Sequence, residues 1–457
     1  MRIVVCVRKG LDGVLGPFDA AAYEEALCVP SAQVILLSMG PPSDEEYLHS
    51  LTRLGAARAV LLSDKAFAGA DTLATAYALS LAVKRLSPDL VFCGRQTLIG
   101  DTGQTGVMLS ALSGLSLITG VMQIASVEEG SVRCQTREEG QRDASLPALL
   151  CFERTRALRL PRLRSRLGAL EVWSAAELGA DPRRLGLVGS PTRVIKSFEN
   201  ESGKRNCRFI SREMLPEVIR EGLKRVDARI QEMKKSEERL PSVLIVGEAP
   251  RAFAESVSDC VDTVPLSDAD EVAGEIKKRN PCAVLWGSDP LSKRLAATVA
   301  ARLGLGLCAD CTALGCEGGE LTMYRPALSG RVIAKIRSQT RPAMATVRTE
   351  GTKKSDIIVT AGAGVEDRLE EVRAFAESLG AELCATRRLV DSGALGYGMQ
   401  VGLTGRTVSP PIYIAVGVSG AVHHIAGMQR SGTVIAVNPD KDAPIFEYSD
   451  YGIIDSF

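Results

Sequence analysis

Short apolar runs alternate with amphipathic segments along most of this chain, and this alternation limits the fold more than any other feature. In the first half, the amphipathic segments carry apolar residues at spacings of three and four, which is the period of a helix. The runs between them have the length and composition of buried strands. The runs are residues 3–7, 34–38, 59–62 and 90–93, and the helical segments are residues 20–28, 44–54 and 72–86. The pattern predicts an α/β fold with parallel sheets and crossover helices.

The alternation is interrupted once and then resumes. Residues 199–240 are polar and highly charged, with charges at helical spacing and few large apolar residues, so a solvated connecting helix is expected there. The later β-type runs are residues 243–246, 283–286, 332–336, 344–347, 357–359, 412–416 and 434–437. We therefore predict three doubly wound, mostly parallel-sheet units, at residues 1–198, 241–350 and 351–457, with a charged helical linker at residues 199–240.

Charge and hydropathy exclude several classes of partner. The chain has 457 residues, of which 55 are basic and 55 acidic, so there is no overall attraction to nucleic acid or to an anionic membrane. No apolar run approaches the roughly 18 residues of a membrane span, and Arg8 and Lys9 follow the first run in place of a signal-peptide cleavage site. We expect a cytoplasmic protein with no nucleic-acid partner and no membrane span.

The cysteines suggest reduced thiols and no metal site. Cys6 and Cys93 are two of 12 cysteines and lie inside apolar runs, which favours core thiols over a disulfide framework. Cys308, Cys311 and Cys316 are close in sequence, but structural zinc and iron-sulfur sites usually have four ligands, and no fourth ligand stands nearby. No metal is therefore expected.

The stretch GVSGAVHHIAGM, which begins at Gly417, carries the most specific chemistry. A strand that ends at Gly417 and opens a helix at Ala421 leaves backbone N–H groups for an anionic or carbonyl-rich ligand. A hydrolase with Ser419 as nucleophile is the alternative. It is disfavoured because His423 and His424 follow too closely on the same helix to act as the base, and no histidine comes later. The pattern favours a cofactor cradle.

Four ordered motifs fill the last part of the chain. They are TRRLVDSG from Thr386, MQVGLTGRTVSPPIYIAVGVSGAVHHIAGM from Met399, AVNPDKDAPIF from Ala436 and DYG from Asp450. With these motifs the segment resembles the FAD-binding domain of the electron transfer flavoprotein α subunit. The resemblance implies a Rossmann-like, DHS-type domain that binds FAD.

The resemblance also implies roles for single residues. Arg387 would lie over the isoalloxazine and stabilise negative charge on the reduced flavin, as a fixed cation does by electrostatic preorganisation. Thr404 would place its hydroxyl at flavin N5, and His424 would meet the C2 carbonyl side. These three are the predicted catalytic residues, and they also contact the cofactor. The other predicted FAD contacts are Thr386, Gln400, Val401, Gly402, Leu403, Gly417, Val418, Ser419, Gly420, Ala421, Asn438, Asp440, Asp450 and Tyr451.

The first half carries motifs of a second subunit. They are GPFDAAAYEEAL from Gly16, FAGADTLATAYAL from Phe67 and CGRQTLIGDTGQTG from Cys93. Residues 1–198 resemble the β subunit of the same family, and YRPALSGRVIAKI from Tyr324 marks residues 241–350 as similar to the first α-subunit domain. The resemblance implies two domains like adenine nucleotide α hydrolases, and a β–α fusion in one chain.

The β-like part is implied to hold a nucleotide, either structural AMP or, as in the electron-bifurcating branch, a second FAD. The stretch GRQTLIGDTGQTG lacks the acidic run of AMP-type members and resembles the bifurcating pattern. Amides at the start of the following helix would cradle the phosphates in either case. The predicted contacts are Val7, Pro17, Phe18, Met39, Asp71, Thr72, Gly94, Arg95, Gly100, Asp101, Thr102, Gly103, Gln104, Thr105 and Gly106.

Residues 155–170, TRALRLPRLRSRLGAL, place basic residues among leucines. No aromatic stacking platform accompanies them, so nucleic-acid binding is disfavoured and a solvated face is the simpler reading. In the family this region forms the loop that docks on the partner dehydrogenase. The resemblance makes Leu160 or Leu163 the anchor.

The resemblance predicts an electron carrier that uses FAD. The implied partners are a flavoprotein dehydrogenase of the acyl-CoA dehydrogenase type, NADH, a quinone oxidoreductase, and ferredoxin or flavodoxin. Electron bifurcation through a second flavin is the favoured form, and a carrier with one FAD and one AMP is the alternative. An adenine-nucleotide-binding scaffold with no redox role is the second alternative.

Overall fold

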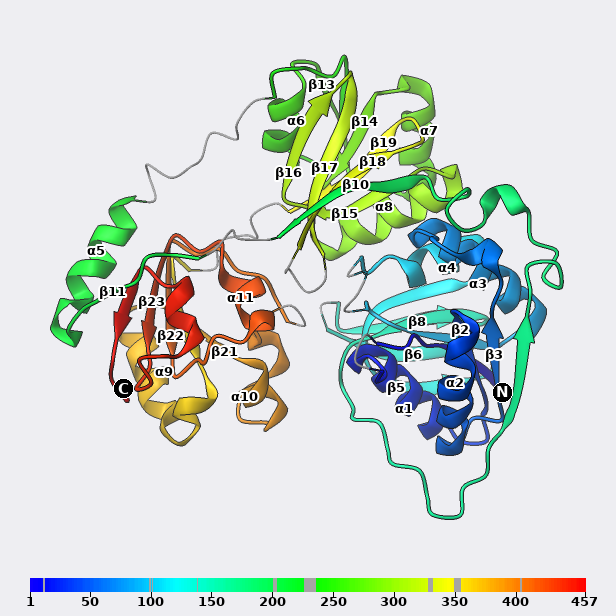
Figure 1. The fold of residues 1–457 in the computed structure, drawn as a ribbon, viewed down its shortest axis with the longest axis horizontal. Helices are drawn as coiled ribbons and strands as arrows, with labels where there is room; N and C mark the ends of the chain where they lie inside the picture. The colour runs from blue at the N-terminus through cyan, green and yellow to red at the C-terminus, as the bar shows by residue number, and fades with distance from the viewer. Residues whose placement is uncertain are drawn as a thin grey trace. The chain divides into compact units, whose positions relative to one another are not determined.

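The computed structural model describes residues 1–10, 13–97, 100, 102–137, 139–199, 204–225, 236–327, 332–348, 355–402 and 405–457. The chain divides into two compact units (Figure 1). Unit 1 consists of Met1–Ser197, Lys235–Leu328 and Ala334–Arg348, and unit 2 of Phe198–Lys234, Ser329–Ile333 and Thr349–Phe457. Parallel sheets form the centre of both units, which confirms the predicted α/β fold class.

A nine-stranded sheet forms the first part of unit 1, with strand order β7-β6-β5-β8-β4-β1-β2-β3-β9. Neighbouring strands are parallel except for the β5–β6 and β6–β7 pairs. The strands are β1 (Arg2–Cys6), β2 (Gln33–Met39), β3 (Arg58–Leu62), β4 (Leu90–Gly94), β5 (Ser116–Glu128), β6 (Ser131–Thr136), β7 (Gln141–Ser145), β8 (Ala148–Phe152) and β9 (Ala169–Trp173).

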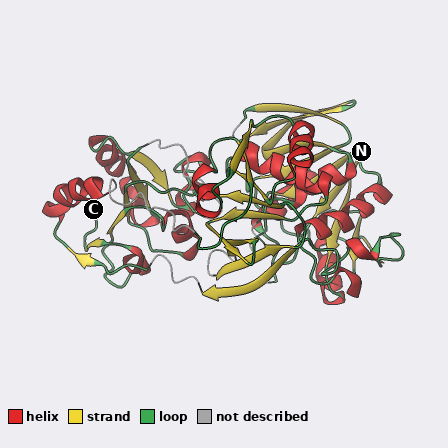
Figure 2. Cartoon of the chain, turned by 90° about the horizontal axis from the view of Figure 1, so that it is seen from above, coloured by secondary structure: helices red, strands yellow, loops and turns green. Residues whose placement is uncertain are grey.

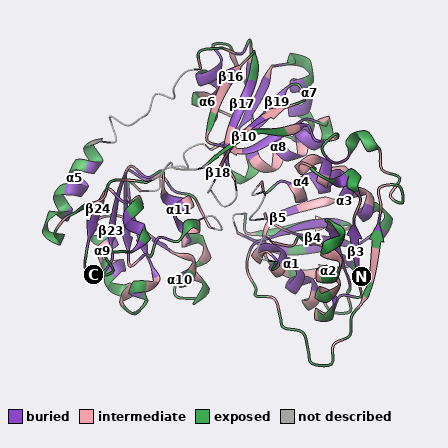
Figure 3. Ribbon diagram, viewed as in Figure 1, coloured by how far each residue is buried: buried purple, intermediate pink, exposed green. Residues whose placement is uncertain are grey.

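Helices cover both faces of this sheet. They are α1 (Pro17–Cys28), α2 (Glu45–Leu51), α3 (Thr72–Leu86) and α4 (Thr105–Ser113). In β1, Ile3 and Val5 pack in the same apolar cluster as side chains of α1 and α2, whereas Val4 packs in the cluster of α3 and α4. The central strands β1, β2, β3, β4 and β8 are mostly apolar because both faces are buried, as the burial colours of Figure 3 show, whereas β6 and β7 at the edge carry exposed polar residues.

A second sheet of unit 1 has strand order β13-β12-β14-β19-β15 and parallel pairing. Its strands are β12 (Val243–Val246), β13 (Val261–Val264), β14 (Ala283–Trp286), β15 (Leu307–Cys311) and β19 (Ala343–Val347). Its helices are α6 (Arg251–Val257), α7 (Ala269–Arg279) and α8 (Pro290–Leu303). Helices α4 and α8 pack together, and one apolar cluster contains side chains from both sheets. The two sheets of unit 1 therefore share a core.

A smaller sheet has the order β10-β18-β17-β16. Its strands, drawn among the yellow arrows of Figure 2, are β10 (Thr192–Glu199), β16 (Ala313–Glu317), β17 (Glu320–Ala327) and β18 (Val332–Ser338). Strands β16 and β17 form an antiparallel hairpin.

The sheet of unit 2 has the order β11-β24-β23-β22-β20-β21, with parallel neighbours. Its strands are β11 (Arg208–Phe209), β20 (Ile357–Ala361), β21 (Glu382–Ala385), β22 (Ile412–Val416), β23 (Thr433–Val437) and β24 (Tyr451–Ile453). Helices α9 (Leu369–Ser378), α10 (Arg387–Asp391) and α11 (Val422–Met428) connect them. Every residue of β22 and β23 is buried, as expected for central strands of a doubly wound sheet.

The charged stretch at residues 199–240 differs from the solvated connecting helix expected there. Its described part supplies β11, which pairs with β24, and helix α5 (Leu215–Arg225). In α5, Leu215, Val218 and Ile219 are buried in the same apolar cluster as Ile412. Their spacing of three and one gives α5 an apolar face despite its many charges. This part of the stretch therefore belongs to the core of unit 2, and residues 226–235 lie outside the described residues.

Candidate functional site

The carboxyl ends of five parallel strands meet along one edge of the unit 2 sheet, and most of the predicted FAD contacts lie there. Strand β20 leads into Gly362, β21 into Thr386, β22 into Gly417 and β23 into Asn438. The amide of Asn438 donates to the carbonyl of Ile453, the last residue of β24, at 3.1 Å. Doubly wound sheets bind ligands at this edge, because helix N-termini and loops converge there.

The turn after β22 is built from glycines because backbone segments pass too close for side chains. Gly417 and Gly420 have φ of +64° and +96°. A Cβ on Gly420 would overlap the backbone of Ile445, and a Cβ on Gly362 would overlap the carbonyl of Gly417. The Ser419 carbonyl accepts from the Ile445 amide at 3.1 Å, which holds the turn in place. Helix α11 begins at Val422, directly after this turn, and the start of a helix is a place where backbone amides bind phosphate oxygens.

Asn438 shapes this turn from the neighbouring strand. Its Nδ2 donates to the Val418 carbonyl at 2.9 Å, and its Oδ1 accepts from the Asp440 amide at 2.9 Å. Asn438 is buried, so the structure gives its side chain a role in fixing the cradle. Asp440 follows it in an exposed turn.

Thr386 and Arg387 lie where β21 ends and α10 begins. Thr386 Oγ1 is buried, and no hydrogen-bond partner for it is found in the described part of the chain. A buried hydroxyl without a partner costs about 1–3 kcal/mol, so a ligand acceptor at this point would be stabilising. Arg387 Nε lies 3.3 Å from Asp391 Oδ2, and the arginine side chain is 41% exposed. Its guanidinium is therefore accessible to an anionic ligand.

The loop that follows Met399 packs against the end of β21. The Val401 amide donates to Ala385 O at 2.9 Å, the Gly402 amide donates to Arg406 O at 3.1 Å, and Gln400 is buried. The structure thus places Gln400, Val401 and Gly402 at the carboxyl edge. Leu403 and Thr404 lie outside the described residues, so the flavin N5 contact of Thr404 stays a prediction.

His424 is buried beneath the cradle. Its Nδ1 lies 3.2 Å from the Val401 carbonyl, and its Nε2 lies 3.0 Å from the Tyr413 hydroxyl. A carbonyl can only accept, so Nδ1–H donates to Val401, and in the neutral ring Nε2 accepts from Tyr413. This arrangement uses both ring nitrogens within the protein and leaves no N–H for a flavin carbonyl. The structure thus gives His424 a positioning role for the Val401 loop, and the C2 contact stays a prediction.

Burial lowers the pKa of His424 to about 4, although the hydrogen bond to Val401 opposes this. The unfolded chain has the ordinary pKa of about 6.5 and binds more protons between these values. The stability from neutral His424 is therefore complete above about pH 6.5 and lost as the pH falls toward about 4, by as much as ~3 kcal/mol. Urea denaturation of wild type and His424→Gln at about pH 7 and about pH 5 tests this. Equal slopes of stability against pH in the two proteins would contradict it.

Asp450 and Tyr451 are not at the carboxyl edge, contrary to the sequence prediction. Asp450 precedes β24 and therefore lies at the amino end of a parallel sheet, opposite the glycine turn. Its carboxylate accepts from the Val434 amide at 2.9 Å and pairs with Arg205. Tyr451 is the first residue of β24. Both residues thus stabilise the far end of the sheet.

Asp455 is the acidic residue that the strand direction places at the carboxyl edge, and sequence reasoning missed it. It follows β24, and its Oδ2 lies 3.3 Å from Arg212 Nη1. The DYG motif directed the prediction to Asp450, which precedes β24. If Gly452 and Ile453 had been recognised as the end of a short strand, the prediction would have been Asp455, the acidic residue that follows it.

A second edge site lies on the nine-stranded sheet between β1 and β4. The strand order reverses at β1, which has β2 on one side and β4 on the other, and such switch points are typical ligand sites. Val7 follows β1, Pro17 opens α1, and Gly94 ends β4. Arg95 lies over the Phe18 ring at 4.8 Å, and Phe18 is fully buried. The Phe18 ring therefore packs against the Arg95 guanidinium and stabilises its position.

The loop before α4 carries an unusual buried amide. Gln104 is 2% exposed, and both its Nε2 and its Oε1 are buried with no hydrogen-bond partner within the described residues. It directly precedes Thr105, the first residue of α4, and follows Gly103, which has φ of +64°. Gly106 allows α4 to approach β8, since a Cβ there would lie 2.7 Å from Cys151 Sγ. Both the amide and the helix N-terminus thus offer hydrogen bonds to a ligand.

Other predicted contacts of this site have clear positions. Thr72 Oγ1 donates to Thr102 Oγ1 at 3.5 Å, Gly100 N donates to Thr97 Oγ1 at 3.3 Å, and Met39 ends β2. Asp101 lies outside the described residues.

Asp71, also a predicted contact, is used by the protein itself. Its Oδ1 accepts from the amides of Leu73 and Ala74, each at 3.0 Å, and caps α3. Its Oδ2 accepts from the amide and the hydroxyl of Thr192, at 2.9 and 2.7 Å. Four donors surround the carboxylate, so Asp71 positions α3 and leaves ligand contact to its neighbours.

Asp19 was not among the predicted contacts, yet it lies at the centre of this edge. It is 6% exposed, and its Oδ2 accepts from the Arg8 amide at 3.0 Å. Burial raises its pKa to about 7, although hydrogen bonds from the Arg8 and Gly94 amides oppose this. The sequence did offer a signal for Asp19 as a site residue, because it is a single acidic residue within the otherwise apolar start of a helix, PFDAAAY.

These features fit a phosphate-bearing cofactor at each edge. The glycine turns and helix N-termini provide amides, Arg387 provides a cation, and the Thr386 hydroxyl and Gln104 amide provide hydrogen-bonding groups that no described residue uses. Within the described residues, no group of three or more His, Cys, Asp or Glu side chains is arranged to hold a metal ion.

Comparison with known proteins identifies the family. Residues 3–178 and 248–374 match the electron transfer flavoprotein domain, and residues 352–429 match the electron transfer flavoprotein FAD-binding domain. The chain is 36% identical over 224 residues to electron transfer flavoprotein subunit alpha of Thermoanaerobacterium thermosaccharolyticum, covering 39% of this chain and 68% of that protein. It is 35% identical over 206 residues to subunit beta of Clostridium acetobutylicum, covering 43% and 79%. It is also 35% identical over 206 residues to the caffeyl-CoA reductase-Etf complex subunit CarD of Acetobacterium woodii, covering 42% and 78%.

The fold and the two edges define an α/β nucleotide-binding protein with an FAD-binding domain in its C-terminal part. The chain belongs to the electron transfer flavoprotein family, and it combines β-like and α-like regions in one polypeptide. It is an FAD-dependent electron carrier that exchanges electrons with other redox proteins. No helix in the described part of the chain is long and apolar enough to cross a bilayer.

Proposed function

We propose that this chain is a bifurcating electron transfer flavoprotein, with FAD at the carboxyl edge of the unit 2 sheet and a second FAD beside α4. The observation that carries the second nucleotide is the Gln104 amide, which is buried at the N-terminus of α4 and has no hydrogen-bond partner among the residues that the structure describes. A buried amide in this state is stabilised by a ligand that hydrogen-bonds to it. The stretch GRQTLIGDTGQTG, which resembles the bifurcating pattern, supports FAD over AMP. AMP at the same residues is the alternative.

At the unit 2 edge, the residues divide the binding of FAD among them. The amides of the glycine turn at 418–420 hold the pyrophosphate, and the Thr386 hydroxyl donates to the cofactor. Arg387 stabilises the negative charge that the flavin gains on reduction. His424 stays neutral and holds the Val401 loop against the site. The bound flavin supplies the ability to take up electrons in pairs and release them singly.

The partners follow from the same reading. NADH or a flavoprotein of the acyl-CoA dehydrogenase type supplies electrons, and a quinone oxidoreductase, ferredoxin or flavodoxin accepts them. The CarD relative supports a partner that acts on CoA thioesters, because its name joins Etf with a CoA reductase. We place this exchange in the cytoplasm. The domains that carry it are residues 1–198, 241–350 and 351–457, with residues 199–240 between them.

An anaerobic titration with NADH tests the proposal. A chain with two FAD takes up two equivalents of NADH before its flavin absorbance is fully bleached, because each flavin accepts one electron pair. A chain with one FAD and one AMP takes up one equivalent. If NADH bleaches no flavin, bifurcation from this donor is contradicted. If an acyl-CoA dehydrogenase with its substrate then reduces the flavin, the single-flavin carrier is the function that remains.

A further inference from the structure

The segment between β8 and β9 is a long loop without regular structure, residues 153–168, which Figure 1 shows extending from the nine-stranded sheet. Its leucines are unusually exposed, since Leu160 is 86% exposed and Leu163 is fully exposed. Apolar side chains presented in this way are typical of an interaction site. The loop also carries six arginines, Arg154, Arg156, Arg159, Arg162, Arg164 and Arg166. The contacts that fix the conformation of this loop therefore also determine how its leucines and arginines are presented to a partner.

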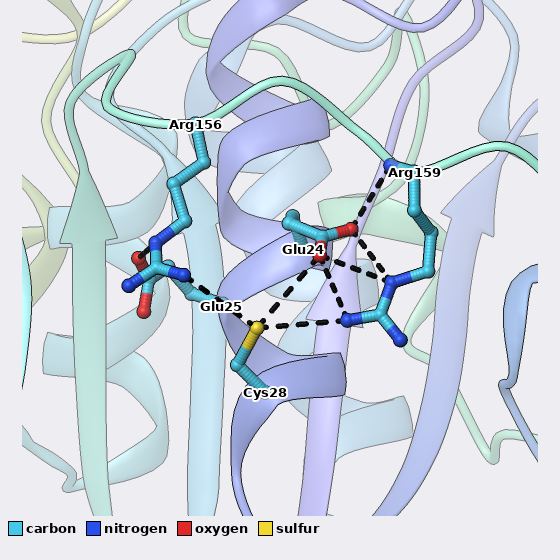
Figure 4. A network of polar contacts seen from close by, with 5 residues as sticks. All are labelled: Glu24, Glu25, Cys28, Arg156 and Arg159. Atoms are coloured by element: carbon cyan, nitrogen blue, oxygen red, sulfur yellow. Dashed lines mark hydrogen bonds and ion pairs between the residues drawn. The ribbon is translucent and has the colours of Figure 1, made fainter.

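Two adjacent carboxylates of α1 hold the start of the loop (Figure 4). Glu24 accepts four hydrogen bonds from Arg159: the backbone amide at 3.0 Å, Nε to both carboxylate oxygens at 3.0 Å, and Nη2 at 2.7 Å. Glu25 pairs with Arg156 Nε at 2.5 Å. Both glutamates are buried, at 9% and 4% exposure. The Glu24–Arg159 pair is bidentate, and a pair of this kind fixes geometry as well as adding stability.

The end of the loop is held separately, at Gly168. The Gly168 amide donates to Thr52 Oγ1 at 2.9 Å, and its carbonyl lies 2.9 Å from His49 Nε2. A Cβ at this position would lie 2.6 Å from the Ala57 carbonyl, so the chain must be glycine here to pass so close. The part between the two anchors, residues 160–167, is thereby presented as a short exposed arch.

The anchors divide the arginines of the loop into two groups. Arg156 and Arg159 are neutralised by α1, whereas Arg162, Arg164 and Arg166 are exposed and have no ion pair with any carboxylate of the described residues. A hollow of about 590 Å³ lies beside the arch, with Leu27 and Leu54 among its apolar lining and Arg53, Arg159 and Arg162 among its polar lining. The exposed surface of the arch is thus both apolar and cationic.

We propose that Glu24 and Glu25 are positioning residues that pre-form the arch 160–167 as a docking surface for an acidic face of the electron-exchange partner. The apolar anchor is Leu160 or Leu163, and the cations left free are complementary to partner carboxylates. The proposal rests on the proposed function, because it takes the partner to be a flavoprotein dehydrogenase. Pre-forming the loop lowers the conformational entropy lost on binding, which is why a clamp at its base affects affinity. Charge complementarity adds to the rate of association and makes it dependent on salt.

Limited proteolysis with trypsin tests the clamp without any partner. Trypsin must take up the arginine guanidinium, so cleavage after Arg159 requires its ion pair to open. In Glu24→Ala, cleavage after Arg159 is expected to accelerate about tenfold relative to cleavage after Arg164, which has no ion pair to lose. Glu46→Ala is the matched control, because Glu46 is an exposed carboxylate on α2 with no ion pair to described residues. An unchanged cleavage ratio in Glu24→Ala would overturn the clamp.

Electron exchange with a purified acyl-CoA dehydrogenase tests the docking role. The carrier concentration for half-maximal rate is expected to rise about fivefold or more in Glu24→Ala with an unchanged maximal rate, and to rise with salt in the wild type. The swapped pair Glu24→Arg with Arg159→Glu is expected to restore the wild-type carrier concentration for half-maximal rate. A changed cleavage ratio with an unchanged half-saturation would show a purely structural role and overturn the proposal. If the wild type exchanges no electrons with the dehydrogenase, the proposed partner is wrong, and the cleavage ratio alone judges the clamp.

Discussion

Replacing Gly420 with alanine is expected to remove FAD from the C-terminal site and to lower the free energy of unfolding of unit 2 by about 3 kcal/mol. Gly420 has φ of +96°, where an L side chain is strained, and its Cβ would overlap the backbone of Ile445. The turn must move to relieve this overlap, which breaks the hydrogen bond between Ser419 O and the Ile445 amide. The amides proposed to hold the pyrophosphate move with it. Flavin absorbance per protein and urea denaturation measure the two effects.

Gly396→Ala is the control for this experiment. Gly396 lies in the same unit with φ of −68°, and a Cβ there would meet no atom within 4 Å. It should retain FAD and change stability little. A Gly420→Ala protein with full FAD content would show that the cradle lies elsewhere.

Replacing Arg387 with alanine is expected to have the second-largest effect. The guanidinium lies at the start of α10 with a side chain that is 41% exposed, and its Nε lies 3.3 Å from Asp391 Oδ2, so it is accessible to negative charge on the flavin. Its loss should weaken FAD binding about tenfold and lower the midpoint potential of the bound flavin by about 30 mV, which for a two-electron couple equals ~1.4 kcal/mol. Both follow because the cation stabilises the reduced, anionic flavin more than the oxidised one.

Arg388→Ala and Arg387→Lys separate this role from general charge effects. Arg388 is the next residue and is exposed, so its removal changes net charge equally. Arg388→Ala should leave the midpoint potential unchanged, and Arg387→Lys should lower it less than Arg387→Ala does. A wild-type midpoint potential in the Arg387→Ala protein would show that Arg387 does not act on the flavin.

The central strands of the sheets were predictable from the sequence because they are buried on both faces, whereas exposed edge strands such as β6 and β7 gave no apolar run. Continuous apolar runs such as Ile412–Val416 leave no other place for the segment than the middle of a sheet, and each run found in the sequence overlaps a strand. Glycine turns after such runs then mark the carboxyl edge, as at Gly417. Helix α5 was misjudged because its abundant charges hide a narrow apolar face formed by Leu215, Val218 and Ile219.

The candidate site was harder to predict wherever orientation mattered. Asp450 and Asp455 stand on either side of a three-residue strand, and only the strand direction shows which of them reaches the ligand edge. His424 was found, but its partners Tyr413 and Val401 were not, because a motif does not reveal which way an imidazole points. The clamp joins Glu24 to Arg159, 135 residues apart, and no local pattern predicts such a pair.

A count of bound cofactors tests the central claim most directly. The purified full-length chain is denatured, the released nucleotides are separated by chromatography, and FAD and AMP are quantified per polypeptide. Two FAD and no AMP per chain is the result expected for a bifurcating flavoprotein with nucleotides at both edges. One FAD with one AMP would contradict bifurcation and leave a single-flavin carrier, and a chain that holds no FAD after reconstitution would contradict the account as a whole.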